Sequence, residues 1–155
     1  MQRTLIALAC IGLLLCGCGV EGSNRPSHPS ERTVSLPVHP SSTAATVFFS
    51  VMVDIVQDPF LGDESSEYGT RVVGVHLTLT ALSDDLTYMP NDITLILVDG
   101  ETLTGHAATE GGLTAGVLAF NESAADWLIF AVYADARLAT VTVALPGAAA
   151  NGGDE

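Results

Sequence analysis

The sequence contains no lysine, and all of its cysteines lie close to the N-terminus. Its 155 residues include 18 acidic residues and only five basic ones, every one an arginine, for a formal net charge of −13. The cysteines are Cys10, Cys16 and Cys18. The rest of the chain therefore has no disulfide framework, no thiol redox centre and no cysteine-ligated metal. A hydrophobic core must stabilise whatever folds there.

The acidic excess limits the partners that this chain can bind. Beyond Cys18 the sequence keeps all of its acidic residues and loses only Arg3 among the basic ones. A surface of this charge is repelled by the phosphates of nucleic acids and by anionic lipid headgroups. We therefore exclude nucleic acid as a partner.

A long hydrophobic run is also absent. The one apolar stretch, Leu5 to Leu15, is too short to cross a bilayer, which needs about 20 helical residues. It follows the positive start Met1-Gln2-Arg3 and ends near the small residue Gly17. A charged start, a short apolar run and a small residue before cleavage are typical of an export signal. We expect residues 1–17 to be a signal peptide.

The end of this stretch, Leu15-Cys16-Gly17-Cys18, resembles the bacterial lipoprotein signal. That signal has an aliphatic residue, two small residues and then the cysteine that receives the lipid. The resemblance implies that Cys18 is lipidated, with palmitate among the acyl chains, and that the membrane is contacted through this lipid. Several chains give a firm anchor, whereas one binds reversibly. The expected location is the extracytoplasmic face of the cell membrane or outer membrane.

Composition divides the remaining chain into three parts. Residues 18–42 are rich in serine and proline, with Pro26, Pro29, Pro37 and Pro40 spaced along them, and predict a flexible linker. Residues 43–146 alternate apolar and polar side chains and predict one β-rich domain. Residues 147–155 predict a disordered acidic tail.

The alternation within 43–146 predicts seven strands and no helix. The clearest strand has Val73, Val75, Leu77 and Leu79 on one face, and Asp99-Gly100 is a strong hairpin signal. Aromatic and β-branched residues favour a strand over a helix between 124 and 136. In the first strand, Val47, Phe49, Val51, Val53 and Ile55 are expected to face the core. The predicted strands span 46–55, 71–82, 93–98, 101–106, 116–120, 124–136 and 138–145.

Seven short antiparallel strands in about 100 residues predict an all-β, immunoglobulin-like sandwich. The segments resemble an immunoglobulin-like domain of unknown function, the DUF4352 type, found in bacterial lipoproteins and secreted antigens. The likeness spans about residues 43–145. It consists of V-x-V-x-L-x-L-T at 73–80, a strand ending in Asp99-Gly100, a glycine-led strand ending in Phe120 and F-x-V at 130–132. It implies a binding or accessory module and supplies no catalytic residue.

We therefore expect a protein that binds another protein of the cell envelope, by pairing at a sheet edge between 101 and 106, and not an enzyme. No catalytic residue, metal ligand or cofactor is assigned. The alternative is a module that binds a small ligand or a metal. Copper would draw on Met52, His76, Met89 and His106, and calcium on two acidic groups: Asp58, Asp63, Glu64 and Glu67, and Asp84, Asp85 and Asp92.

Replacing Cys18 tests the anchor. Cys18→Ala should abolish incorporation of radioactive palmitate and release the protein from the membrane fraction, because no other cysteine meets the signal pattern. Cys16→Ala is the matched control and should keep its label. Labelled Cys18→Ala protein would contradict the assignment.

Overall fold

Alternating apolar side chains on the strands build the core of the folded domain. The computed structural model describes residues 32–62 and 67–146. In strand β4 (Thr70–Ala81), Val73, Val75, Leu77 and Leu79 are all buried, as the sequence predicts. Strand β10 (Ser123–Tyr133) lies beside β4 along its whole length and buries Leu128 and Phe130 in the same layer.

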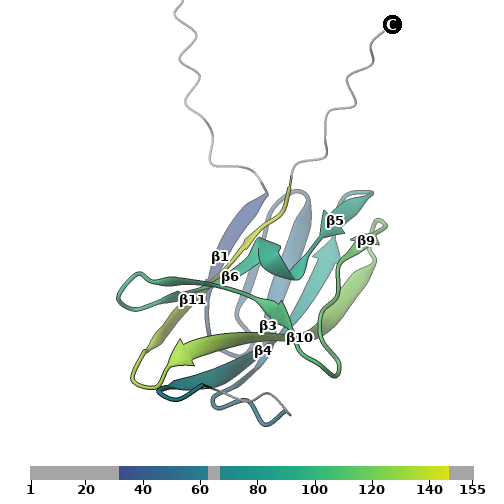
Figure 1. The fold of residues 1–155 in the computed structure, drawn as a ribbon. Helices are drawn as coiled ribbons and strands as arrows, with labels where there is room; N and C mark the ends of the chain where they lie inside the picture. Colours follow the sequence, from purple (N-terminus) through teal and green to yellow (C-terminus); the bar gives the residue numbers. More distant parts are fainter. Residues whose placement is uncertain (1–31, 63–66, 147–155) are drawn as a thin grey trace, which may run out of the picture.

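Two antiparallel sheets pack face to face, and a two-stranded sheet lies at one end of them (Figure 1). The sheet orders are β1-β11-β6-β7, β2-β3-β4-β10-β8 and β5-β9. A short 3₁₀ helix, η1 (Pro90–Asp92), precedes β6. The remaining strands are β1 (Thr33–Pro37), β2 (Thr43–Ala45), β3 (Phe49–Gln57), β5 (Leu86–Tyr88), β6 (Ile93–Leu97), β7 (Thr102–Thr104), β8 (His106–Ala107), β9 (Gly116–Leu118) and β11 (Leu138–Ala144).

The sheet orders confirm the all-β sandwich and show how it differs from the usual immunoglobulin arrangement. The order β3-β4-β10-β8 corresponds to strands A, B, E and D of that fold, and β11, β6 and β7 correspond to F, C and C′. The position beside F normally belongs to G, the last strand of the chain. Here β1, the first strand, occupies it and pairs antiparallel with β11.

The linker prediction is therefore wrong for its last part. Residues 33–37 form β1, in which Val34 and Leu36 are buried in the core. Pro37 ends that strand opposite Thr140, at a sheet edge where a missing N–H costs no ladder bond. Val34, Leu36 and Val38 lie among prolines, and no neighbouring segment of the sequence suggests a strand that could pair with them. The partner strand is more than 100 positions away, since Val34 pairs with Val143.

The inner face predicted for the first strand is wrong at both of its ends. Val47 is 72% exposed because the strand begins only at Phe49. Ile55 is 48% exposed because a bulge between Val53 and Ile55 shifts the register and turns Ile55 outward. The middle of the prediction is confirmed, with Phe49, Val51 and Val53 buried.

Other strands were predicted more completely. Residues 124–133 of the predicted strand lie in β10, and 134–136 belong to the turn that follows it. Asp99-Gly100 joins β6 and β7 as a hairpin. The predicted edge strand at 101–106 divides into β7 and β8, which belong to different sheets. Strands β2 and β5 were not predicted, because three-residue segments carry too little alternation to be recognised.

The first and last described residues meet at one pole of the domain (Figure 1). The backbone N–H of Leu145 donates to the carbonyl oxygen of Arg32 at 3.0 Å, and the Arg32 guanidinium donates to the carbonyl oxygen of Pro146 at 3.2 Å. None of the described residues belongs to a helix long and apolar enough to cross a membrane. The predicted signal peptide, Cys18, linker residues 18–31 and the tail 147–155 lie outside the described residues.

Truncation of Leu36 tests whether β1 belongs to the domain. Leu36 is 1% exposed, and Leu36→Ala should lower the free energy of unfolding by about 2–5 kcal/mol, measured by urea denaturation. Val47→Ala, on an exposed side chain, is the control and should change it by less than about 0.5 kcal/mol. Equal effects would show that β1 contributes nothing to the core.

Candidate functional site

The candidate site begins where the chain leaves one sheet for the other. Strand β7 ends at Thr104 and β8 begins at His106, so Gly105 is the crossing point. A Cβ atom at this position would lie 3.0 Å from the carbonyl oxygen of Ile93 and 3.3 Å from the Phe130 ring, which explains the glycine. Because β8 is only two residues long, it covers only part of β10.

The hydrogen bonds of β10 show which of its backbone groups remain without a strand neighbour. Trp127 uses both of its backbone groups on the side away from β4: its N–H donates to Gly111 and its carbonyl oxygen accepts from Leu113. Backbone groups alternate along an antiparallel strand, so those of Ile129 and Ala131 point the same way. Ile129 pairs with His106 of β8. In the part of the chain that the structure describes, no strand pairs with Ala131 on that side.

Strand β7 presents a second edge on the same side of the sandwich. The N–H of Gly105 donates to Ile93 and the carbonyl oxygen of Glu101 accepts from Leu97, so these odd-numbered positions face β6. The backbone groups of Thr102 and Thr104 therefore point away from the sheet. β7 is the last strand of its sheet, and the predicted edge near 101–106 is confirmed there.

A cavity of about 310 Å³ lies at the end of the β10 edge. It is bounded by the turn that follows β10 and by the β6–β7 hairpin, which meet where the N–H of Val98 donates to the carbonyl oxygen of Arg137. Tyr133, 58% exposed, belongs to both the edge and the cavity. The lining residues are Val98, Asp99, Tyr133, Asp135, Ala136 and Arg137.

Arg71 holds this turn in place. Its guanidinium donates to the carbonyl oxygens of Tyr133, Ala134 and Ala136, the last two at 2.8 Å each. It also forms a bidentate pair with Asp58, with N–O distances of 2.6 and 3.0 Å. Hydrogen bonding to Asp58 raises the pKa of Arg71, against a smaller opposing effect of desolvation, so the group stays charged. Arg71 is a positioning residue for the cavity.

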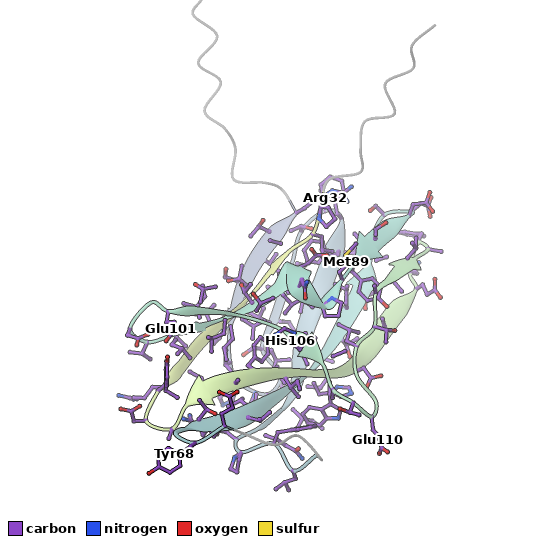
Figure 2. The ribbon with its side chains drawn as sticks, viewed as in Figure 1. Arg32, Tyr68, Met89, Glu101, His106 and Glu110 are labelled. Carbon is purple, nitrogen blue, oxygen red and sulfur yellow. The ribbon has the colours of Figure 1, made fainter. Side chains whose placement is uncertain are left out.

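The surroundings of the edge are mostly acidic. Asp99 and Asp135 line the cavity, and Glu101 lies on the hairpin beside it (Figure 2). Arg137 is the only basic lining residue. Within residues 32–62 and 67–146, none of these four side chains forms an ion pair. Asp99 accepts a hydrogen bond from the backbone N–H of Glu101, and Asp135 lies near enough to Arg71 to help raise its pKa. The side chains of Asp99, Glu101, Asp135 and Arg137 can still pair with charges on a bound molecule.

A second polar group lies on the outer face of the five-stranded sheet. Asp54 accepts a hydrogen bond from the Thr78 hydroxyl at 2.7 Å and lies 2.9 Å from Nδ1 of His76. The edge of the His76 ring meets Trp127 at 5.2 Å between centroids, and Phe60 packs on Trp127 at the same distance. The alternation of Val75 and Leu77 on the inner face puts His76 on the outer one, as the structure shows, but it gives no sign of the partner Asp54, which lies at the bulge of β3.

Three of the acids considered for calcium make other contacts. Asp58 pairs with Arg71, Asp84 accepts from the N–H of Phe120, and Asp92 accepts from the N–H of Met89. Asp63 and Glu64 lie outside the described residues. Among the residues that are described, no group of three or more histidines, cysteines and acids could hold a metal ion.

Sequence reasoning missed the main features of the site for identifiable reasons. The vacant position beside β10 depends on a change of sheet, which local alternation cannot show. The contacts of Arg71 with the turn join residues more than 60 positions apart. One signal was available: Gly105 interrupts the predicted edge strand, and an internal glycine often marks a bend or a close backbone approach.

No protein-family model matches the chain, and no curated protein matches it. Among solved structures, the chain is similar to YcdA of Bacillus subtilis, a protein named as a lipoprotein, with a TM-score of 0.50 and 18% sequence identity. The match covers 61% of this chain and 30% of YcdA. At this identity the likeness shows a shared β fold.

Substitution of Arg71 tests its role. Arg71→Ala should lower the free energy of unfolding by about 1 kcal/mol, because three turn carbonyls, one of them part-buried, and the Asp58 carboxylate lose a charged donor. Amide hydrogen exchange at residues 133–137 should rise more than elsewhere. Arg71→Lys should be nearly as destabilising as Arg71→Ala, since one ammonium group cannot bond to Asp58 and to the turn at the same time. Unchanged exchange in that turn would contradict the role.

Proposed function

We propose that this chain is a lipid-anchored extracytoplasmic protein whose immunoglobulin-like domain binds another protein of the cell envelope. The observation that carries the proposal is the position of the first and last described residues. Arg32 and Pro146 lie together at one pole, and the turns at 67–70 and 133–137 lie at the other, where Tyr68 is labelled (Figure 2).

This arrangement suits a tethered module. A lipid on Cys18 would be joined to Arg32 by 14 residue steps, which reach at most about 50 Å when fully extended. The domain would then attach to the membrane through one pole and present the other outward. The extracytoplasmic location follows from the signal pattern at residues 1–18 and agrees with the name given to YcdA. Gly19, in place of an aspartate after the cysteine, favours the outer membrane where a cell has two.

Protein binding is favoured over the other classes by the edges of the two sheets. Backbone groups of β7 and β10 without strand neighbours can form main-chain hydrogen bonds with an extended segment, a common mode of peptide recognition. The acidic surface opposes nucleic acid. The resemblance to immunoglobulin-like domains of lipoproteins and secreted antigens supports the same class of function.

Site-specific photo-crosslinking in native membranes tests the proposal. A benzophenone side chain in place of Glu101, on the hairpin at the open edge, should give a discrete adduct with one envelope protein. The same group in place of Val117, which is 60% exposed on β9, is the matched control and should give none. Adducts from neither position, or equal adducts from both, would contradict the proposed binding.

A further inference from the structure

We propose that the vacant strand position beside β10, from Ala131 to Tyr133, binds an extended segment of a partner protein that carries lysine or arginine. The inference rests on the proposed function and specifies where the partner binds and by which chemistry. Three observations support it: the vacancy, the cavity at its end and the charge around both.

The vacancy results from the crossing at Gly105. If the chain had stayed in one sheet, the residues before β8 would pair with β10 beyond Ile129. Instead they form β7 in the other sheet. An extended segment of another protein can take the position that they leave, in line with β8. It would pair with the N–H and carbonyl of Ala131, whose side chain is exposed.

The short edges elsewhere offer less to a partner. Natural sheets protect their edges by keeping the edge strands short, as β2, β7 and β8 are here. β10 differs because it has 11 residues and β8 covers only Leu128 and Ile129. The uncovered part is thus the end of a long, well-supported strand, held on its other side by β4 through Tyr133.

Charge determines which segment fits. Around the cavity, Asp99, Glu101 and Asp135 outnumber Arg137, and Arg71, which holds the turn, is already paired with Asp58. A second copy of this chain would bring the same acidic group against itself, so antiparallel pairing of two β10 edges is disfavoured. A lysine or arginine beside the paired stretch would instead enter the cavity near Asp99 and Asp135, with the Tyr133 ring alongside its methylene groups.

The experiment measures peptide binding by the full chain in detergent micelles. The probe is a fluorescein-labelled octapeptide of alternating valine and lysine with blocked ends, compared with the valine–glutamate peptide. Anisotropy should show binding of the lysine peptide that is at least about tenfold tighter and that weakens with added salt. Bound peptide should slow hydrogen exchange at Ala131 and Tyr133. Equal binding of the two peptides, or no binding, would overturn the proposal.

Two proline variants distinguish the two edges. Ala131→Pro removes an N–H that points to the vacancy, and Thr102→Pro removes one that points away from β6, so neither breaks a native ladder bond. Ala131→Pro should abolish peptide binding and Thr102→Pro should leave it intact. Thermal melting checks that both variants fold. The opposite result would place the partner on β7 and overturn the assignment to β10.

Charge variants keep the test valid even if proline unfolds the strand. Asp135→Asn should weaken binding of the lysine peptide about two- to fivefold, the effect expected for one exposed ion pair. Glu110→Gln, an exposed acid on another loop (Figure 2), is the control and should have no effect. Equal effects of the two would contradict binding at the cavity. A partner adduct from position 101 that survives Ala131→Pro would refute this inference and leave the proposed function standing, whereas absence of any adduct would refute the proposed function.

Discussion

Burial of two apolar sheet faces against each other holds the domain together, because no cysteine lies beyond residue 18 to add a crosslink. Phe49 and Phe130, both fully buried, come from the five-stranded sheet, and Leu36 and Leu95 of the four-stranded sheet belong to the same buried cluster. The four-stranded sheet is complete only with β1. The core thus depends on a pairing between the first and last strands of the described chain.

The strands that the sequence predicted best are those whose environment is local and uniform. β4 and β10 lie side by side in the middle of a sheet, with one face in the core, so their alternation follows directly from position. Strand β1 was not predicted, because it has only two buried residues and they lie in a proline-containing segment. The inward orientation predicted for Ile55 was wrong, because one extra residue at the bulge of β3 reverses the faces of the strand beyond it.

The site was predictable only in part. An edge strand before His106 could be inferred from the Asp99-Gly100 hairpin, since the returning strand of a hairpin often ends its sheet. The vacancy beside β10 could not, because it is defined by the strand that Gly105 diverts. Arg71 could not be assigned either: a lone arginine at the start of a strand gives no sign that it bonds to Asp58 on one side and to a distant turn on the other.

The meeting of β1 and β11 at the anchored pole also determines how the domain bears mechanical load. Under the proposed attachment, the membrane pulls on Arg32 while a bound partner pulls near Tyr133 at the opposite pole. β1 begins at the first pole and runs toward the second, so the tension acts along the strand (Figure 1). The hydrogen bonds of an antiparallel ladder lie perpendicular to that direction. The pairs from Thr33–Ala144 to Pro37–Thr140 are therefore loaded together in shear and do not open one after another from the end.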